Sequence, residues 1–526
     1  MISWVLLWTA IFSNIDCLNV LVWNPTLGLS HVRFLGKIAD VLVSDGHNVT
    51  ILSPILDPLV NAAEHTSAAH VLLYQPKYHS INDYRKLEMK SAAFWNAPVG
   101  SKCLSVEDMN QIIAMLKQIC KGILEDNDFI EMLRSSNFDV GISEIFELSV
   151  MGIFELIGVN KSVAVSAVGM TPYVNYIAGI PSYPSFVPGP YSTFGDEMTF
   201  WERLYNFKID LEMRYRFYFW EKDVWSVFND AHPGFPDLKE LFKRKTGIVL
   251  LNVNEFTEAP RPTANIIRYI GGLAIRKPMP LNQDLNELLN KRSQNVLFSL
   301  GSFTQATDMP NWLKKDIISA FESFPNTTFI WKYEDEIDSN MLSPQSNIYT
   351  MKWVPQTDLL DDRRLSAFIT HAGMNSVHEA TYFGKPMIAI PLFGDQFRNA
   401  DNLRRRGLAV MINRPDLNRN TLATALHEVL SENSTFALKA AMVARHLRGR
   451  PTLARAETSR WVRLVGEKGP LDYLILQSRN MSLIQYYNID VIGYLSAQIA
   501  FALFALFKTA RLIVGKVVKL RKYKAE

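Results

Sequence analysis

Polar side chains are concentrated in the stretch HAGMNSVHE, which follows a short apolar run typical of a buried strand. Ser376 and Glu379 are three residues apart, the spacing of a capping box, so these two alone predict only a well-capped helix. His371, Gly373 and Asn375 are not needed for a cap, and they fall where backbone N–H groups and the helix dipole favour an anion. We therefore expect a diphosphate here, with Gly373 allowing close backbone approach and His371, Asn375 and Ser376 donating hydrogen bonds.

Two flanking motifs extend this site. Upstream, WVPQ places the indole of Trp353 three residues before Gln356, which suits stacking on a planar base and hydrogen bonding to its edge or sugar. Downstream, a predicted strand runs into PLFGDQ, where Asp395 and Gln396 could bind sugar hydroxyls. Each residue alone also fits an ordinary core or surface position. Their order and spacing together favour a nucleotide-sugar site.

Alternating strand and helix patterns position these motifs. Residues 19–23 predict a strand, 32–45 a helix and 49–52 a second strand, and further strands are predicted at 138–142 and 248–252. The proline-punctuated stretch 276–280 interrupts the alternation. Strands are predicted again at 295–300, 328–331, 367–370 and 387–390. The pattern predicts two α/β domains with parallel sheets and a ligand in the cleft at the carboxyl ends of the strands.

Composition excludes several classes of function. The 526 residues are 48% hydrophobic and 20% charged, with a formal net charge of +3, so the chain is folded material and not a nucleic-acid-binding protein. No CxxC motif or His/Cys cluster is present, which argues against redox catalysis and a zinc site. Cys17 borders the predicted signal segment, and Cys103 and Cys120 are left as candidates for a disulfide.

The two ends indicate membrane targeting. Residues 1–17 have the apolar core of a signal peptide, and the uncharged run 491–507 predicts a transmembrane helix. An amphipathic or buried terminal helix is the alternative for that run. The basic tail 508–526 is expected to be cytoplasmic, which puts the rest of the chain in the lumen. Five glycosylation sequons agree with a lumenal location, at Asn48, Asn160, Asn326, Asn433 and Asn480.

Taken together, WVPQ, HAGMNSVHEA and PLFGDQ resemble the nucleotide-sugar signature of the UDP-glycosyltransferases, and most of all the membrane-bound animal UDP-glucuronosyltransferases. FSLGSF, GIPSYP, FWERLYN and QYYNIDVIGY extend the resemblance over nearly the whole chain. It implies an α/β GT-B fold, in which two Rossmann-like domains with parallel sheets face each other, plus a C-terminal transmembrane helix. It also implies a single-pass type I protein of the endoplasmic reticulum membrane with lumenal catalytic domains. The predicted boundaries are 1–17 for the signal peptide, 18–270 for the acceptor-binding domain, 271–284 for a linker, 285–470 for the UDP-sugar-binding domain, 471–490 for a juxtamembrane segment, 491–507 for the transmembrane helix and 508–526 for the tail.

The resemblance also assigns roles to the motif residues. Trp353 would stack on uracil, Gln356 would contact uracil or ribose, and Glu379 would accept the ribose hydroxyls. His371, Asn375 and Ser376 would hold the diphosphate near the Gly373 backbone, with Ser302 as a further phosphate contact. Asp395 and Gln396 would bind the transferred sugar, glucuronate or glucose.

The resemblance places the general base in the first domain. His31 stands at the mouth of the first predicted strand–helix turn, where a purely structural histidine is the alternative. An ordinary imidazole pKa near 6.5 suits proton transfer near neutral pH. The family pairs this histidine with an aspartate, but the aligned residue here is Glu144, one methylene longer, and Asp139 earlier in the predicted strand competes with it. We favour Glu144 because it lies at the carboxyl end of that strand.

The implied reaction is a metal-independent, inverting displacement that uses a UDP-sugar as co-substrate and no cofactor. The only D-x-D motif, Asp126-Asn127-Asp128, is expected to lie on a solvated helix surface and not to ligate a metal. Residues 74–96 and the aromatic-rich stretch 173–225 are expected to build a pocket for small lipophilic acceptors, although the aromatics also suit membrane contact or ordinary core. An inactive UDP-binding or partner protein, a transferase acting on lipid acceptors and a homo-oligomer stay open.

Overall fold

The computed structural model describes residues 17–67, 69–78, 95, 106–146, 148–189, 192, 194–302, 304–335, 342 and 346–525. The predicted signal peptide, except for residue 17, lies outside the described residues, as does Cys103, so the candidate disulfide stays a prediction. Cys120 itself is buried in the hydrophobic core.

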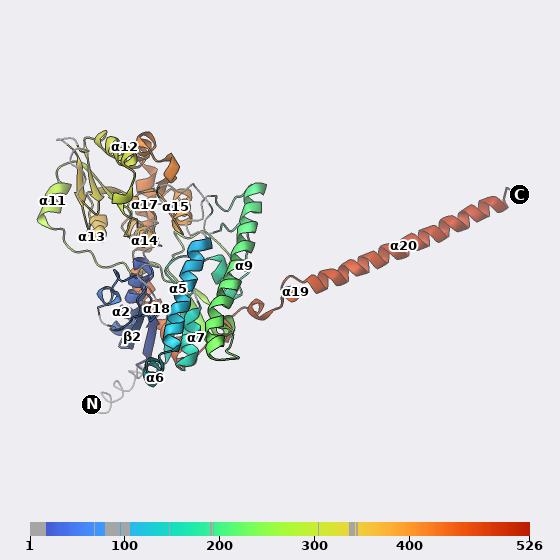
Figure 1. Ribbon diagram of the computed structural model, residues 1–526. Coiled ribbons are helices and arrows are strands. Elements are labelled where there is room, and N and C mark those ends of the chain that lie inside the picture. The colour runs from blue at the N-terminus through green and yellow to red at the C-terminus, as the bar shows by residue number, and fades with distance from the viewer. Residues whose placement is uncertain are drawn as a thin grey trace, which may run out of the picture.

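The first part of the chain forms a parallel sheet of seven strands in the order β3-β2-β1-β4-β5-β6-β7 (Figure 1). The order reverses between β1 and β4, which makes their carboxyl ends the switch point where such sheets bind ligands. The strands are β1 (Asn19–Trp23), β2 (Asn48–Pro54), β3 (His70–Tyr74), β4 (Val140–Glu144), β5 (Ser162–Ser166), β6 (Thr246–Leu251) and β7 (Ile267–Tyr269). The helices are α2 (Leu29–Ser44), α5 (Val106–Leu124), α6 (Asn127–Ser135), α7 (Ser149–Leu156), α8 (Pro172–Ala178), α9 (Phe200–Ala231) and α10 (Leu238–Lys245).

The second part forms a parallel sheet of six strands in the order β10-β9-β8-β11-β12-β13, with its switch point between β8 and β11. The strands are β8 (Gln294–Ser299), β9 (Thr327–Lys332), β10 (Ile348–Met351), β11 (Leu365–Thr370), β12 (Met387–Ala389) and β13 (Ala409–Met411). The helices are α11 (Gln283–Leu289), α12 (Asn311–Glu322), α13 (Gln356–Asp361), α14 (Met374–Tyr382), α15 (Gln396–Arg405), α16 (Arg419–Leu430), α17 (Thr435–Leu447) and α18 (Arg450–Lys468).

The predicted strands all form, because strands buried on both faces of a parallel sheet appear in the sequence as continuous apolar runs. Every residue of β4, β5, β6 and β9 is buried. The predicted helix 32–45 begins earlier, at Leu29, directly after Gly28, whose φ of +80° is a conformation that glycine adopts without strain.

Helix α18 departs from the predicted boundaries. It lies within the range 285–470 assigned to the second domain, yet it packs on the first sheet and on α2. Its Trp461, Val462 and Val465 are buried in the same hydrophobic cluster as Val163 and Val165 of β5. The apolar face of α18 therefore ties the end of the second part back to the first, which the order of motifs did not reveal.

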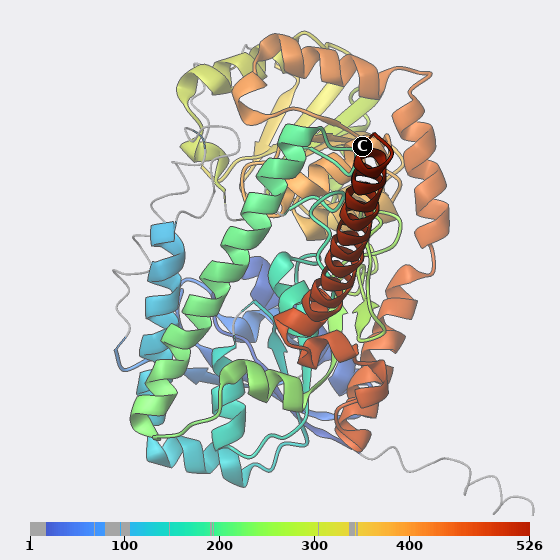
Figure 2. The same cartoon turned by 90° about the vertical axis from the view of Figure 1, so that its right-hand side faces the viewer.

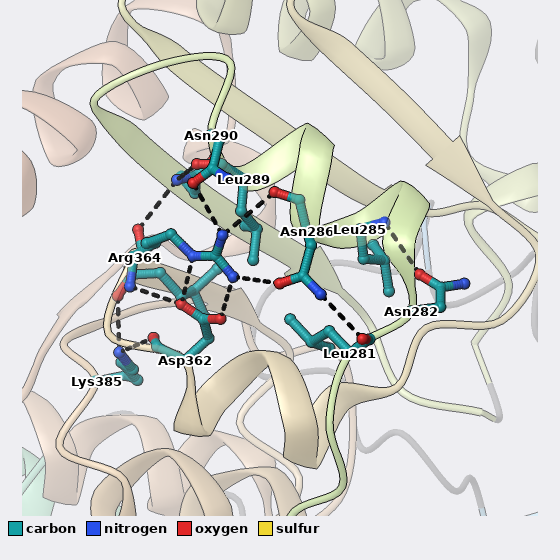
Figure 3. A network of polar contacts seen from close by, with 11 residues as sticks. Leu281, Asn282, Leu285, Asn286, Leu289, Asn290, Asp362, Arg364 and Lys385 are labelled. Carbon is teal, nitrogen blue, oxygen red and sulfur yellow. Dashed lines mark hydrogen bonds and ion pairs between the residues drawn. The ribbon is translucent and has the colours of Figure 1, made fainter.

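A polar network fixes the amino end of β11, the strand that leads into HAGMNSVHE (Figure 3). Arg364 donates to both Asp362 carboxylate oxygens at 2.9 and 2.6 Å and to the side-chain oxygens of Asn286 and Asn290 on or just after α11. Lys385 Nζ donates to the carbonyl oxygens of Asp362 and Leu365 at 2.7 and 2.8 Å. Burial lowers the pKa of Lys385 to about 8. The network locks α11 against the start of the strand that positions the site.

The C-terminal segment leaves the body through α19 (Leu483–Tyr486) and continues as α20 (Ile489–Tyr523). Figures 1 and 2 show α20 projecting away from the body, crosswise to α9 and from the face on which α9 lies. Residues Ile489–Arg521 are long and apolar enough to cross a membrane, with a mean hydropathy of 1.8, and none of the most apolar part is buried. A buried terminal helix, one alternative for this run, is therefore wrong.

Candidate functional site

A cavity of about 600 Å³ opens between the carboxyl ends of the two sheets. This is the location expected for a ligand in facing parallel sheets. Its lining includes the predicted base and every residue predicted to hold the donor, namely His31, Ser302, Trp353, Gln356, His371, Gly373, Asn375, Ser376, Glu379, Asp395 and Gln396. Residues 340 positions apart in the chain thus meet in one place, although their individual roles stay predictions.

The predicted base pairs with the predicted glutamate at the first switch point. His31 Nδ1 lies 2.5 Å from Glu144 Oε2, and Glu144 Oε1 accepts a hydrogen bond from the backbone N–H of Ala167 at 2.7 Å. A carboxylate only accepts, so the proton of this contact is on Nδ1 and Nε2 is the ring nitrogen left to take a proton. The competing Asp139 instead accepts from the Asn19 backbone at the opposite end of the sheet, so it does not support His31.

The charge environment of His31 favours its protonated form. Burial lowers the pKa of His31, but the charge and hydrogen bond of Glu144 and the more distant Asp395 together raise it above 6.5. The His31 side chain is 27% exposed and that of Glu144 only 6%, so the carboxylate acts on the ring with little screening. Phe146 packs its ring edge-on at 5.5 Å between centroids and restricts the imidazole further.

The loop after β11 is built around the His371 ring. A Cβ atom on Gly301 or Gly373 would fall 2.6 Å from Cε1 or 2.4 Å from Nε2 of that ring, so glycine at both positions makes room for it. Ala372, between His371 and Gly373, has a φ of +61°, a strained conformation for an alanine that costs roughly 1 kcal/mol or more. Thr370 Oγ1 and the Asn399 side chain hold the Ala372 backbone in place.

The predicted capping box at Ser376 and Glu379 is wrong. Helix α14 begins at Met374 with Gly373 as its N-cap and without a side-chain cap. Ser376 and Glu379 therefore lie inside the helix, and the backbone N–H groups of its first turn point towards the cavity end of the helix unpaired by a cap. This arrangement favours an anion there.

His371 is held neutral. Burial and, to a smaller extent, the charge of Lys332 lower the pKa of His371 to about 4. The ring therefore offers one donor and one acceptor near neutral pH, without a positive charge. Positive charge near the expected diphosphate must come from other groups that line the cavity, such as Lys332, Arg33 and Arg276.

Gln356 and Glu379 are already bonded to each other. Gln356 Nε2 donates to Glu379 Oε2 at 2.6 Å and to Ser376 Oγ at 3.3 Å, and Thr357 donates to Glu379 Oε1 at 2.7 Å. Burial raises the pKa of Glu379, while Gln356 and Thr357 oppose this effect. Each carboxylate oxygen keeps a further lone pair, which suits the predicted contact with ribose hydroxyls.

The pair predicted to bind the sugar, Asp395 and Gln396, lies at the start of α15. Asn399 donates to Asp395 Oδ2 at 2.7 Å, and burial raises the pKa of Asp395 against the opposing effects of Asn399, Arg398 and His31. Gln396 Oε1 accepts from the backbone N–H groups of Leu392 and Phe393 at 2.9 and 3.1 Å. The amide oxygen of Gln396 is thereby used, so its NH₂ group is the part that could donate to a sugar hydroxyl.

Two cations next to Trp353 were not anticipated from the sequence. The indole is 60% exposed in the cavity, with Arg33 of α2 5.5 Å and Lys332 of β9 5.9 Å from its centroid. Arg33 has no carboxylate within ion-pair distance among the described residues, whereas Lys332 pairs with Glu334 at 2.8 Å. Only one signal in the sequence could have identified Arg33, namely that it follows His31 by two residues.

Polar side chains also join the two halves beside the cavity. His378 Nε2 lies 2.9 Å from the Asn252 carbonyl and Nδ1 lies 3.2 Å from Asn254 Nδ2, so the ring is neutral with its proton on Nε2. Burial lowers the pKa of His378 to about 4. Asn252 Nδ2 also donates to Asn375 Oδ1 at 3.3 Å, and Arg398 Nη1 donates to the Met170 carbonyl at 2.6 Å. Asn252 and Asn254 follow β6, His378 lies on α14 and Arg398 on α15, and sequence reasoning gave these four residues no role.

Other predictions have mixed outcomes. None of the described residues in the stretch 173–225 lines the 600 Å³ cavity, so these aromatics do not form the expected wall of that space. Asp126 caps α6 by accepting from the Phe129 N–H, and no group of three or more potential metal ligands occurs in the described parts of the chain. All five sequon asparagines are exposed, with Asn48 at the start of β2, so each is accessible for the predicted glycosylation.

Comparison with known proteins agrees with this geometry. The family model described as UDP-glucoronosyl and UDP-glucosyl transferase matches residues 19–524. The putative UDP-glucuronosyltransferase ugt-55 of Caenorhabditis elegans is 31% identical over 415 residues, covering 78% of this chain and 78% of that protein. UDP-glucuronosyltransferase 2B7 of Homo sapiens is 26% identical over 505 residues, covering 94% of this chain and 93% of its own.

Solved structures share the fold. A UDP-glucosyltransferase from Polygonum tinctorium that glucosylates indoxyl matches with a TM-score of 0.59 and 13% identity over 87% of this chain and all of its own. The glycotransferase of kitacinnamycin matches with a TM-score of 0.55 and 19% identity over 86% of this chain and 99% of its own. At these identities the likeness shows the GT-B fold of two facing α/β domains.

Proposed function

The chain belongs to the UDP-glucoronosyl and UDP-glucosyl transferase family, and we propose that it transfers glucuronate or glucose from a UDP-sugar to a small lipophilic acceptor. The observation that carries this proposal is the geometry of one cavity. His31, bonded to Glu144, faces the donor motif across it, and the charge of Asp395 reaches His31. A base from one sheet and a sugar-binding carboxylate from the other are thus close enough to act on one substrate.

The proposed reaction is a single displacement. His31 Nε2 takes the proton of the acceptor hydroxyl while Glu144 holds Nδ1–H and stabilises the imidazolium that forms. The acceptor oxygen then bonds to the anomeric carbon of the sugar, and the bond from that carbon to the phosphate oxygen breaks. UDP leaves with the bonding electron pair, and attack from the opposite face inverts the anomeric configuration.

The leaving diphosphate needs stabilisation of its negative charge. The uncapped first turn of α14 supplies backbone N–H groups and the positive end of its dipole. Lys332 and Arg33 supply full charges in the same cavity, and neutral His371 supplies a hydrogen bond. These groups support a displacement that needs no metal ion, and full activity in the presence of EDTA is the expected result.

The proposal includes a single-pass membrane anchor formed by α20, with the basic tail in the cytoplasm and the catalytic body in the lumen of the endoplasmic reticulum. The length and apolar composition of Ile489–Arg521 support the anchor, and the exposed sequon asparagines agree with a lumenal body. Glycosidase sensitivity of the mature protein is the measurement that tests the orientation.

The inactive alternative would be favoured by one feature, the exchange of the family's aspartate for Glu144. The 2.5 Å contact supports an active enzyme, because the longer side chain reaches the imidazole and still bonds to Ala167. The oxygen that contacts His31 is a carboxylate oxygen, as an aspartate would supply. We therefore favour an active enzyme.

The decisive experiment supplies UDP-glucuronate and UDP-glucose, in parallel, with a panel of phenols to the full-length protein in membranes. Formation of a glycoside from at least one donor is expected, and His31→Ala should abolish transfer while UDP still binds. If UDP binds but no glycoside forms from either donor, the proposed transferase activity is refuted and the protein is a UDP-binding protein. Normal turnover by His31→Ala would instead show that another group is the base.

A further inference from the structure

Helix α9 carries an aromatic face that nothing in the described chain covers. Six large apolar side chains on this helix are between 49% and 73% exposed. At 3.6 residues per turn they fall within one arc of the helix surface, so they form a single stripe along it. We call this stripe the α9 aromatic face, made of Phe200, Trp201, Phe207, Leu211, Tyr215 and Phe219.

The opposite side of the same helix segment is polar and buried. Asn206 is 3% exposed, donates to the carbonyl oxygens of Pro184 and Val187 and accepts from the Gly189 N–H. Asp210 is 7% exposed and accepts from Ser182 Oγ at 2.6 Å. A water-facing helix buries its apolar side and exposes its polar side, so this segment is inverted. Contiguous exposed apolar surface of this kind marks an interaction site.

The α9 aromatic face belongs to neither of the spaces that could take an acceptor near His31. No residue of α9 lines the 600 Å³ cavity or the small apolar space of about 10 Å³ beside His31 and Phe146. In Figure 2 α9 lies on the outside of the body. The aromatics of this helix are therefore directed away from the reaction that the cavity supports.

The membrane anchor leaves from the same face of the body. Figure 2 shows α20 projecting from the face that carries α9, and Figure 1 shows the two helices lying crosswise. The lead-in helix α19 approaches α9: burial and the adjacent Tyr487 raise the pKa of Tyr486, and Tyr183 and Asp210 lie close enough to add to this effect. If α20 crosses a bilayer, α9 lies along the plane of that bilayer and at its surface.

The loop before α9 and the lead-in helix α19 extend this apolar surface. Tyr183 and Phe186, in the loop tied to Asn206, are 40% and 41% exposed and stack on each other. Leu483 and Ile484 of α19 are 73% and 55% exposed. Exposed Trp and Tyr side chains beside Lys208, which is also exposed, match the chemistry of the lipid headgroup region.

We propose that the α9 aromatic face inserts into the headgroup region of the bilayer that α20 crosses, so that the catalytic body is held on the membrane at two places. This inference rests on the membrane anchor proposed above. Trp201, 73% exposed, is the most exposed side chain of the α9 aromatic face, and tryptophan favours the membrane interface. The body is thereby fixed in orientation, with α9 parallel to the membrane plane.

Tryptophan fluorescence of the full-length protein in phosphatidylcholine vesicles tests this directly. Lipids brominated near the headgroup quench only nearby indoles, and α20 itself contains no tryptophan. Trp201→Phe should remove most of the bromine-dependent quenching. Trp312→Phe is the matched control, because Trp312 is 59% exposed near the start of α12 in the second sheet's domain, and it should leave the quenching unchanged.

The outcomes separate this inference from the anchor and from the enzymatic activity. Protein that resists alkaline extraction but shows equal quenching in wild type and Trp201→Phe would overturn the α9 contact and keep the anchor. If the protein does not stay in the vesicles, both the α20 anchor and the α9 contact are refuted. A second copy of the chain covering α9 would also leave quenching unchanged, and disulfide crosslinking of Tyr215→Cys would then reveal it. Glycoside formation is measured separately and does not enter the readout.

Discussion

The substitution Glu144→Gln tests the proposed base most sharply, because it changes one atom type in a defined contact. Glu144 accepts two hydrogen bonds, one from His31 Nδ1–H and one from the Ala167 N–H. Glutamine has one carbonyl oxygen for these two donors and must turn its NH₂ group towards the other. When that group faces His31, the ring places its proton on Nε2, where it cannot accept the proton of the acceptor hydroxyl.

The size of the effect follows from the kind of bond that is lost. A hydrogen bond to a charged group contributes about 1.5–3 kcal/mol. If this hydrogen-bond energy is lost in the transition state, where the imidazolium forms, kcat should fall roughly 10-fold to 150-fold, because about 1.4 kcal/mol corresponds to a factor of ten in rate. Glu144 is also the largest influence that raises the pKa of His31, so its removal leaves burial to lower that pKa. The acid limb of the rate profile should therefore move to lower pH while the plateau falls.

The assay is the initial rate of UDP release with saturating UDP-sugar, measured as a function of pH for each variant. Glu144→Asp keeps the carboxylate and should retain more activity than Glu144→Gln. Asp139→Asn is the matched control, because Asp139 bonds to Asn19 at the far end of the same strand and should leave kcat and its pH dependence unchanged. UDP affinity should stay the same in all three variants.

An unchanged acid limb in Glu144→Gln would refute the reasoning, even if kcat fell, because a general loss of structure lowers the plateau without moving the limb. Equal effects of Asp139→Asn and Glu144→Gln would also refute it. In that case the sheet edge as a whole, and not the contact to His31, would set the activity.

Three further predictions concern the same cavity. Because the pKa of His31 is raised in the folded state, its pairing with Glu144 stabilises that state fully below pH 6.5, and this stabilisation is lost as the pH rises through the raised pKa. In denaturant unfolding, the free energy of unfolding of the wild type should therefore exceed that of Glu144→Gln at low pH, and the difference should shrink as the pH increases. His371→Ala should weaken UDP binding about tenfold by calorimetry, as expected for a lost ligand hydrogen bond, and the affinity should show no titration of His371 near neutral pH, because its pKa is about 4. Asp395→Asn keeps the shape that Asn399 contacts, so the inhibition constant of UDP should hold while turnover of the UDP-sugar falls, and an equal loss for both ligands would contradict the sugar contact.

Local features of the fold were predictable from the sequence because their signals are local. The buried runs before Asn24 and His371 predicted strands, and the end of the first helix was predicted to within one residue, although its start lies three residues before the predicted residue 32. The carboxyl ends of predicted parallel strands were enough to expect one cleft. The same rule selected Glu144 over Asp139, because only the former lies at the carboxyl end of β4.

Features that depend on distant contacts could not be predicted. The return of α18 to the first sheet is decided by apolar packing of residues about 300 positions apart, since Val163 and Trp461 belong to one buried cluster. The bonds of His378 to Asn252 and Asn254 depend on how the two halves face each other. The capping box failed for a different reason, since Gly373 starts α14 before Ser376 and the spacing alone could not fix that start.

The two histidines that line the cavity, His31 and His371, have environments suited to opposite tasks. Burial lowers the pKa of both, but the charged neighbour differs: Glu144 raises that of His31, whereas Lys332 lowers that of His371 further. A ring beside a carboxylate can take a proton and hold it as a stabilised cation. A ring beside a cation stays neutral and can only donate a hydrogen bond to a phosphate that already carries the negative charge. Because titratable groups with opposed shifts suit separate roles, the neighbours Glu144 and Lys332, more than the histidines themselves, distinguish the proposed base from the proposed donor site.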